Sequence, residues 1–269
     1  MTKLSRRVFL GSAPAAAAAA GIFGTFFSTA AEAAIKWDET YNVIVIGAGG
    51  AGLSAAVSAK EAGAKKVVVL EKMMFAGGNT IRAGCGFNAA IKADYEKAGI
   101  TDSPKLHAEQ TLVAGDGRGD PVLVHQLTEK APESVQWLKD HGVKFQDHIY
   151  QIYGGLYKRA RNPIGPRGGA YIKALLEVCK KEDIPILYNT RVVEIIREHQ
   201  LSGRVLGVKV EQKGGKTLYL RATNAVVAAA GGFAANDRLT AISDPRMGQL
   251  GTCLLYTSPS PRDAPESRM

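Results

Sequence analysis

Hydrophobic residues near the start of the chain follow two different patterns. Residues 41–46 contain an unbroken apolar run, Val-Ile-Val-Ile, which is typical of a strand that is buried on both faces. Residues 53–62 are rich in alanine and show a helical pattern that ends at Gly63, and residues 66–70 form a second apolar strand. The order strand, helix, strand predicts two parallel strands joined by a helix.

The rest of the chain continues with helices and strands. Asp120 followed by Pro121 is a typical helix start, and residues 122–139 then follow an amphipathic helical pattern. Gly214 and Gly215 predict a hairpin turn. A second helix is predicted at 168–181, and strands at 185–188, 192–196, 205–210, 217–220 and 225–230. We therefore expect a doubly wound, Rossmann-like α/β domain in which a three-stranded antiparallel β-meander precedes the last parallel strand.

Glycines follow the first strand at a spacing that predicts a nucleotide site. Gly47, Gly49 and Gly52 form the pattern GxGxxG. The first glycine permits a tight turn, the second lets the backbone approach a pyrophosphate, and the third lets helix and strand pack closely. Glu71 ends the second strand, 19 residues after Gly52, where a carboxylate accepts hydrogen bonds from ribose hydroxyls. A 2′-phosphate would be repelled there, so NADP is disfavoured, whereas NAD and FAD both remain open.

A second glycine-rich segment follows soon after Glu71. Residues 77–80 read Gly-Gly-Asn-Thr, and residues 83–90 read Ala-Gly-Cys-Gly-Phe-Asn-Ala-Ala. Glycine lets the backbone lie close to a flat or anionic ligand, and an NAD site does not need a second segment of this kind. Asn79 and Thr80 can donate hydrogen bonds to the second phosphate or to a ribityl chain. The segment therefore favours FAD.

Charge and cysteine content exclude several other functions. The formal net charge is +9, but the basic residues are scattered between acidic ones and form no stripe interleaved with aromatic residues, so nucleic-acid binding is not expected. The basic excess would suit a small anionic substrate, although a solvated surface is the simpler explanation. Cys85, Cys179 and Cys253 are far apart and show no metal-ligand spacing, so no metal site is predicted.

The first 33 residues resemble a twin-arginine signal peptide. Ser5-Arg6-Arg7 is followed by Val-Phe-Leu, an uncharged alanine-rich stretch and the small-residue site Ala31-Glu32-Ala33. This resemblance implies recognition by the twin-arginine export machinery, transport in the folded state, cleavage after Ala33 and a periplasmic location. The alternative is a membrane anchor, because the stretch approaches the roughly 20 residues that a spanning helix needs.

Residues 150–169 form a polar segment with several tyrosines, arginines and glycine pairs. Long irregular segments inside a compact domain are often functional. Arg161 and Arg167 are therefore candidates for holding an acidic substrate, because a guanidinium group can bind a carboxylate through two hydrogen bonds. The alternative is a solvated loop with no ligand.

Several strings of the sequence together resemble one family of FAD-dependent oxidoreductases. They are IGAGGAGLSAA, EK followed by GGNT, AGCGFNAA, TDSPKLHAEQT, NTRVVEI and AVVAAAGGFAAND, and they span most of residues 41–246. The family includes soluble fumarate reductase and flavocytochrome c, with urocanate reductase and 3-oxosteroid dehydrogenases as relatives. The resemblance implies an FAD-binding domain with an inserted β-meander, and a flavin oxidoreductase as the function.

The resemblance also implies which residues surround FAD. Ala51 and Gly52 would lie on the pyrophosphate, Glu71 on the adenosine ribose, and Val193 against the adenine through its backbone. The complete set of expected cofactor residues is Gly47, Gly49, Ala51, Gly52, Glu71, Lys72, Gly78, Asn79, Thr80, Gly84, Cys85, Val193 and Gly231. Two positions depart from the family: Cys85 stands where glycine is usual, and residues 161–163 read Arg-Asn-Pro where His-Arg-Pro is common.

The pattern changes after residue 251. The string CLLYTSPSPR resembles a translated sequencing adapter, so residues 252–269 are expected to be foreign, with a disordered tail as the alternative. We expect a signal peptide at 1–33 and a truncated FAD-binding domain at 34–251. In the family the catalytic residues and the capping domain lie further downstream, so the catalytic residues of this chain remain unknown.

These features together predict a periplasmic FAD-dependent reductase of an α,β-unsaturated carboxylate such as fumarate. Its electrons would come from a separate cytochrome c or a quinol-linked donor, because no haem-attachment motif follows the leader. Two alternatives stay open. The first is a 3-oxosteroid-type dehydrogenase, which the basic segment at 150–169 disfavours. The second is a catalytically silent flavin-binding fragment.

Overall fold

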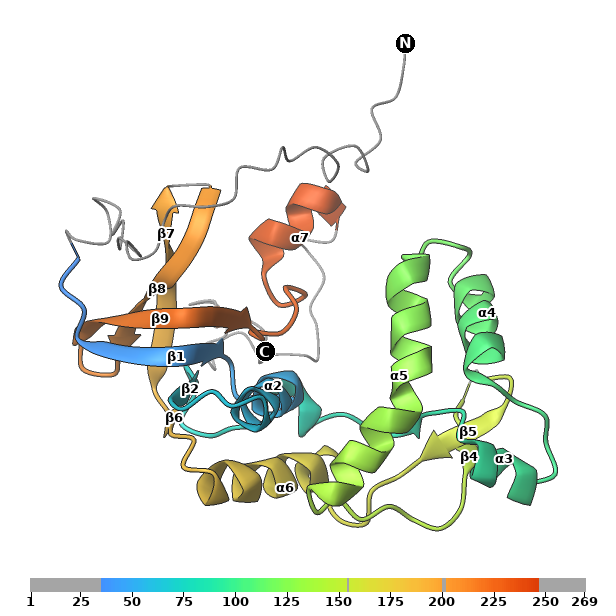
Figure 1. Ribbon diagram of the computed structural model, residues 1–269. Coiled ribbons are helices and arrows are strands. Elements are labelled where there is room, and N and C mark those ends of the chain that lie inside the picture. Colours follow the sequence, from blue (N-terminus) through green and yellow to red (C-terminus); the bar gives the residue numbers. More distant parts are fainter. Residues whose placement is uncertain (1–34, 154, 200–201, 247–269) are drawn as a thin grey trace, which may run out of the picture.

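A six-stranded mixed sheet is the central feature of the computed structural model, which describes residues 35–153, 155–199 and 202–246 (Figure 1). Its strand order is β6-β2-β1-β9-β8-β7. The central strand β1 (Glu39–Ile46) pairs in parallel with β2 (Val67–Leu70) on one side and with β9 (Thr217–Ala228) on the other. β6 (Ile186–Leu187) extends the parallel part beyond β2. The expected leader at 1–33 and tail at 252–269 lie outside the described residues.

The antiparallel part of the sheet is the predicted β-meander. β7 (Thr190–His199) pairs with β8 (Ser202–Gln212), and β8 pairs with β9. The hairpin between β8 and β9 turns at Gly214 and Gly215, which have φ angles of 103° and 87°. These left-handed angles are the reason why glycine occupies both positions. The α/β fold with an inserted meander is thereby confirmed.

One strand assignment was wrong. The sequence pattern predicts separate strands at 217–220 and 225–230, whereas the structure has a single strand, β9. Polar residues between the two predicted strands are paired across the sheet: the Asn42 side chain donates to Thr223 Oγ1 at 3.1 Å and to Asn224 Oδ1 at 3.3 Å. A register shift between Tyr41 and Val43 lets β1 follow β9 through this stretch. β9 therefore runs from the meander directly into the parallel sheet.

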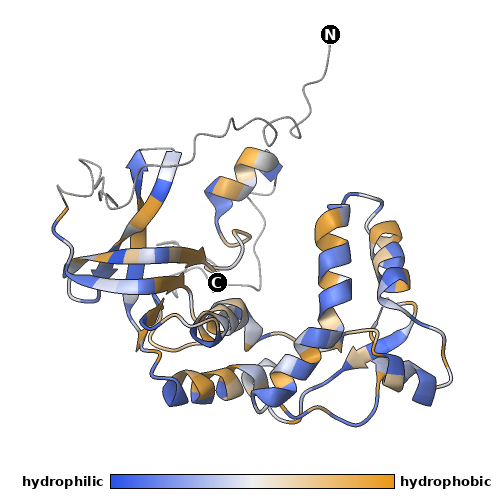
Figure 2. Ribbon diagram, in the orientation of Figure 1, coloured by the Kyte–Doolittle hydropathy of each residue, from blue (hydrophilic) through white to orange (hydrophobic). Residues whose placement is uncertain are grey.

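Two helices cover one face of the parallel strands. Leu53 and Val57 of α2 (Gly50–Glu61) are buried in the same cluster as Val43 and Val45 of β1. Ile172, Leu175 and Cys179 of α6 (Gly168–Lys181) complete this cluster. Figure 2 shows α6 alternating between hydrophobic and hydrophilic bands, as expected for a helix with one buried side.

The opposite face of the sheet is covered by the meander. Ile44 of β1 and Val68 of β2 lie in one buried cluster with Val208 and Val210 of β8 and Leu220 of β9. Burial of a large aliphatic side chain contributes about 1.5–3 kcal/mol. The two clusters therefore hold β1 and β2 firmly between the helices and the meander, and both strands end at the edge where the predicted nucleotide site lies.

A second group of elements lies beside the main sheet (Figure 1). Asp120 caps α5 (Pro121–Asp140) by accepting a hydrogen bond from Val122 N at 2.8 Å, which confirms the predicted helix start. α4 (Pro104–Ala114) packs along α5. The short elements here and elsewhere are η2 (Gly78–Thr80), β3 (Phe87–Asn88), α3 (Lys92–Lys97), β4 (Tyr150–Gln151), β5 (Lys158–Arg161) and α7 (Asp237–Ser243).

The segment at 150–169 is more regular than its composition suggests. β4 and β5 lie within it, and together with β3 they form a three-stranded antiparallel sheet in the order β3-β5-β4. Ala160 pairs with Asn88 on one side and with Tyr150 on the other. The expectation of an irregular loop was therefore wrong for these strands, because the pairing partner of β5 comes from a distant part of the sequence.

Candidate functional site

The turn between β1 and α2 has the geometry that the glycine pattern predicts. Gly47 has a φ angle of 103°, and a β-carbon there would lie 2.5 Å from the carbonyl oxygen of Ala229. A β-carbon on Gly52 would lie 1.8 Å from the carbonyl oxygen of Gly47. Both positions therefore require glycine for the turn and for close packing. A β-carbon on Gly49 would meet only Gly77 O, at 3.9 Å, so its glycine is not explained by contacts within the protein.

A cavity of about 310 Å³, here called the main cavity, opens at this turn. It lies at the ends of β1, β2 and β9 and at the start of α2, where a helix N-terminus carries partial positive charge. Nine of the expected cofactor residues line it: Gly47, Gly49, Ala51, Glu71, Lys72, Gly78, Asn79, Thr80 and Gly231. The cavity thus brings together segments that are up to 185 residues apart, from residue 46 to residue 231.

Glu71 is fixed in place by two backbone amides. Its Oε2 accepts a hydrogen bond from Ala48 N at 2.8 Å, and its Oε1 accepts one from Met73 N at 2.9 Å. The residue is only 7% exposed. These bonds tie the end of β2 to the turn after β1. A carboxylate has about four lone-pair sites, so acceptor capacity remains for hydroxyl groups of a ligand in the cavity.

The second glycine-rich segment forms another wall of the main cavity. Gly77 has a φ angle of 127°, its N–H donates to Ala48 O at 2.8 Å, and it bridges to Gly49. Thr80 Oγ1 accepts a hydrogen bond from Gly50 N at 3.0 Å. Asn79 Oδ1 is buried and has no partner among the described residues. Buried polar atoms are nearly always hydrogen-bonded, so this oxygen fits a ligand that donates a hydrogen bond.

A second cavity, of about 290 Å³, adjoins the main cavity. Gly50 and Thr80 line both of them. Cys85, Phe87 and Tyr171 contribute to the walls of the second, which are largely apolar. Burial raises the pKa of the Cys85 thiol, and the nearby Arg167 opposes this shift. The thiol is therefore protonated at neutral pH.

The remaining expected residues lie outside the main cavity. Gly52 packs against the backbone of Gly47, as described above, and Gly84 is exposed, so that a β-carbon there would have no described atom within 4 Å. Val193 lies in β7, one residue after Val192, which does line the cavity. The cofactor roles of all these residues stay predictions.

The two arginines suggested as substrate ligands are in different environments. Arg161 is 4% exposed, its Nη1 pairs with Asp94 Oδ2 at 2.5 Å, and its Nη2 donates to Ala89 O at 3.0 Å. Arg167 is exposed and precedes α6 with a φ angle of 48°. Both substrate roles stay predictions, and that of Arg161 would require its guanidinium to serve a ligand in addition to two protein partners.

Sequence reasoning missed part of the cavity wall. Thr190, Arg191 and Val192 at the start of β7 line it, as do Ala229 and Ala230, which directly follow β9. Ala229 and Ala230 could have been predicted from the sequence, because they directly precede the expected cofactor residue Gly231. For β7 the family resemblance implied the neighbouring residue Val193.

This geometry, a glycine turn before a helix N-terminus with a fixed carboxylate at the next strand, defines a dinucleotide-binding domain. The chain belongs to the FAD binding domain family, whose model matches residues 42–260. The cofactor of this family is FAD, and the unpaired Asn79 oxygen and the acceptor capacity of Glu71 fit a ligand with ribose and ribityl hydroxyls. The matched range passes residue 251, where the domain was expected to end.

Known relatives give a more particular resemblance. The chain is 36% identical over 211 residues to "Fumarate reductase (cytochrome)" of Shewanella frigidimarina, an alignment that covers 78% of this chain and 36% of the relative. The open conformation of a flavocytochrome c3 fumarate reductase superposes with a TM-score of 0.73 at 31% identity and covers 80% of this chain and 38% of that one. A 3-ketosteroid-Δ4-(5α)-dehydrogenase from Rhodococcus jostii RHA1 also has a TM-score of 0.73, at 27% identity, with coverage of 83% and 52%.

The chain is thus a member of an FAD-dependent oxidoreductase family related to fumarate reductases. It spans 36% of the length of the fumarate reductase that it matches. Within residues 35–153, 155–199 and 202–246, no helix combines the length and the apolar character needed to cross a membrane.

Proposed function

We propose that this chain is the FAD-binding part of a reductase that acts on the double bond of an α,β-unsaturated carboxylate such as fumarate. The observation that carries the proposal is the main cavity: its fixed Glu71 carboxylate and unpaired Asn79 oxygen lie within a chain that is 36% identical to a fumarate reductase. FAD, when bound, supplies hydride transfer. The residues of this chain contribute the binding and orientation of the cofactor.

Each wall of the main cavity has a part in this binding. The N-terminus of α2, at Gly49 to Ala51, offers backbone N–H groups and partial positive charge to the pyrophosphate. Glu71 accepts hydrogen bonds from ribose hydroxyls while its two amide partners keep its rotamer fixed. Asn79 accepts a hydrogen bond from the inner part of the cofactor. Preorganisation of these groups lowers the entropy lost on binding.

The proposal also includes the cellular location, the electron donor and the substrate. A leader with adjacent arginines would direct the folded protein to the periplasm. A separate cytochrome c or a quinol-linked donor would supply electrons, which agrees with the cytochrome named for the relative. The substrate would be a small carboxylate held by arginine side chains, with Arg167 as the exposed candidate in this chain.

A 3-oxosteroid-type dehydrogenase is the second candidate. It is supported by the steroid dehydrogenase of equal TM-score. Such an enzyme removes hydrogen from its substrate, whereas an enoate reductase adds hydrogen to a double bond. Full-length protein reduced with a dye and then mixed with fumarate, urocanate or acrylate should be reoxidised by one of them. Reoxidation by none of these acids, together with reduction of the oxidised protein by a 3-ketosteroid, would favour the dehydrogenase.

FAD binding can be tested separately on the chain itself. Gly49→Ala adds a methyl group that meets only one atom, at 3.9 Å, so the fold should be preserved. The same methyl group would obstruct the approach of a pyrophosphate to the turn. We expect titration with FAD to show at least about a tenfold loss of affinity, equivalent to ~1.4 kcal/mol.

Gly119→Ala is the matched control for this experiment. Gly119 lies between α4 and α5, and its added methyl group would make an ordinary contact of 3.4 Å with Val124. FAD affinity should equal that of the unaltered chain. If Gly49→Ala binds FAD normally, the main cavity is not the cofactor site. If no variant binds FAD although all are folded, the chain is a silent fragment.

A further inference from the structure

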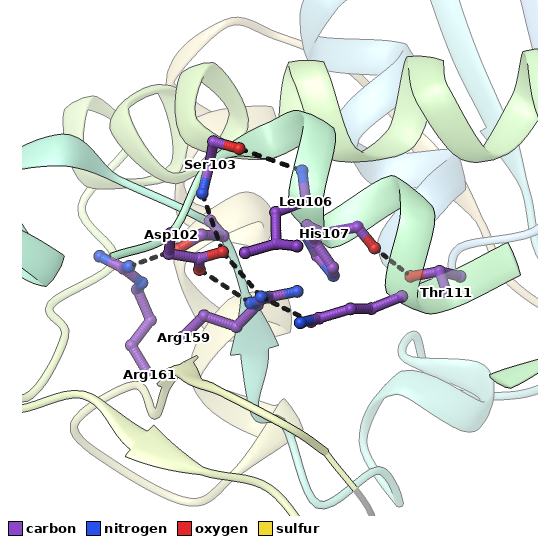
Figure 3. Close-up of polar contacts among 9 residues, drawn as sticks. Asp102, Ser103, Leu106, His107, Thr111, Arg159 and Arg161 are labelled. Atoms are coloured by element: carbon purple, nitrogen blue, oxygen red, sulfur yellow. Dashed lines mark hydrogen bonds and ion pairs between the residues drawn. The ribbon is translucent and has the colours of Figure 1, made fainter. Parts of the chain in front are cut away.

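A small cavity of about 140 Å³ lies between α4, β3 and β5, well separated in its lining from the main cavity. We call it the α4 cavity. His107 and Gln110 of α4 line it from one side, and Arg159 of β5 and Asn88 of β3 from the other, with Tyr157 directly before β5. Figure 3 shows Asp102, His107 and Arg159 gathered between the helix and the strand. The proposed FAD site uses none of these residues.

Two residues that line the α4 cavity each have a polar atom without a hydrogen-bond partner. Asn88 Oδ1 and His107 Nδ1 are both buried and unpaired among the described residues. A buried polar atom without a partner is unfavourable, so both side chains would gain from a hydrogen-bonding ligand in the cavity that they line. The Asn88 amide can turn by 180° without a change of shape, and it can therefore present either its oxygen or its NH₂ group to a ligand.

The other polar groups of the cavity are donors. Arg159 binds Asp102 through two hydrogen bonds, from Nε at 2.9 Å and from Nη2 at 2.7 Å. Its Nη2 also donates to Gln110 Oε1 at 2.9 Å. This bond orients the Gln110 amide so that its NH₂ group is the donor that remains. The Tyr157 ring lies 5.4 Å from the Arg159 guanidinium carbon, and its hydroxyl adds a further donor.

His107 contributes a neutral ring to this group. Burial lowers its pKa, the nearby Arg159 lowers it further, and Asp102 acts in the opposite direction. A neutral imidazole carries one N–H donor, which can be placed on Nδ1. The cavity thus combines one guanidinium with several neutral donors, while Ile152 and Leu156 supply an apolar wall.

We propose that the α4 cavity binds a short-chain monocarboxylate. The carboxylate would lie toward His107, Gln110 and Arg159, and its hydrocarbon part toward Ile152 and Leu156. Size supports this class, because a cavity of ~150 Å³ holds benzene, a molecule of about six non-hydrogen atoms. Butyrate has six non-hydrogen atoms. The site is independent of the proposed reductase activity, since it shares no lining residue with the main cavity.

The proposal can be tested by butyrate binding to the whole chain. Sodium butyrate should raise the midpoint of thermal unfolding relative to sodium chloride at equal ionic strength, because a ligand that binds only the folded state stabilises it. Calorimetric titration then gives the affinity. Tyr157→Phe removes one donor and should weaken binding by about two- to tenfold. Equal midpoints in butyrate and chloride, with no heat of binding, would overturn the proposal.

Blocking variants place the binding at this cavity. Ala114 lines it at the end of α4, and Ala114→Phe should fill it and abolish the butyrate effect. Val113→Phe is the matched control, because Val113 is 78% exposed and does not line the cavity. Ala114→Leu serves the same purpose with less bulk if the phenylalanine variant fails to fold. Butyrate binding that survives both variants at position 114 would contradict the assignment.

Two further ligands identify the chemistry. Butyramide has the shape of butyrate without its charge and should bind at least about tenfold more weakly, because the guanidinium then gains no anion besides Asp102. Equal binding of butyramide would overturn the carboxylate class. FAD tests the location of the site instead: saturating FAD should leave the butyrate affinity unchanged. Loss of butyrate binding in the presence of FAD would place the ligand in the main cavity and reject the α4 cavity, without bearing on FAD binding itself.

Discussion

The α-carbon of Gly168 lies against the carbonyl oxygen of Thr80, so closely that a β-carbon at position 168 would be 1.6 Å from that oxygen. Gly168 begins α6, and Thr80 ends η2 in the second glycine-rich segment. Thr80 Oγ1 also accepts a hydrogen bond from Gly50 N at the start of α2. The contact therefore holds two helix starts and the second glycine-rich segment together beside the main cavity.

The first prediction concerns this contact. Gly168→Ala should lower the free energy of unfolding by about 2–3 kcal/mol, because the backbone must move to admit the methyl group. It should also weaken FAD binding, since Thr80 lines the main cavity. Urea unfolding and FAD titration measure the two effects. Gly169→Ala is the control: its methyl group would lie 3.3 Å from a side-chain atom of Pro166, and the variant should be neutral or slightly stabilising.

The second prediction concerns the buried ion pair between Asp102 and Arg159. The side chain of Asp102 is fully buried and that of Arg159 is 7% exposed. Asp102→Asn leaves the guanidinium buried without its counter-charge, and should lower the free energy of unfolding by about 3–5 kcal/mol. Glu133→Gln is the control: it breaks an exposed ion pair with Lys130 and should change the free energy of unfolding by less than ~1 kcal/mol. If urea unfolding shows a similar loss of free energy of unfolding in both variants, the buried ion pair does not have the predicted weight.

The third prediction concerns Glu71. In Glu71→Gln one of the two amides, Ala48 N or Met73 N, faces an NH₂ group instead of an oxygen. The free energy of unfolding should fall by about 1–3 kcal/mol. FAD affinity should fall by about tenfold through the weaker ribose acceptor. Glu211→Gln, at an exposed position on β8, is the control and should change neither quantity. Unaltered FAD affinity in Glu71→Gln would contradict the ribose role.

The glycine turn could be predicted because its determinants are local. Gly47, Gly49, Gly52 and Glu71 lie within one strand-helix-strand unit, where each residue type has a separate geometric reason. The structure explains Gly47 and Gly52 by contacts of 2.5 and 1.8 Å at a virtual β-carbon. The same local logic placed Asn79 and Thr80, which also line the main cavity.

The buried arginines could not be predicted in this way. Arg159 and Asp102 are 57 residues apart in sequence, and Arg161 and Asp94 are 67 apart. No local pattern shows that two such residues meet, because their approach depends on the pairing of β3 with β5. A segment rich in arginine therefore resembled a solvated or ligand-binding loop, whereas two of its guanidinium groups are buried within the protein.

The last prediction concerns the pH dependence of stability. Burial raises the pKa of the Cys179 thiol from 9.0 to about 11. Because the folded-state pKa lies above the unfolded one, this contribution is fully present below pH 9 and is lost as the pH rises to about 11. Cys179→Ala removes the titrating group. The difference in free energy of unfolding between the unaltered chain and this variant should therefore shrink between pH 9 and 11.

A second variant separates titration from packing. Val178→Ala also removes volume from α6 next to the same core, but it titrates nothing. Its difference from the unaltered chain should stay constant over the same pH range, because lysine and tyrosine groups titrate equally in both proteins. Urea unfolding at each pH provides the measurement. A constant difference for Cys179→Ala as well would mean that the thiol ionises in the folded protein as readily as in the unfolded chain.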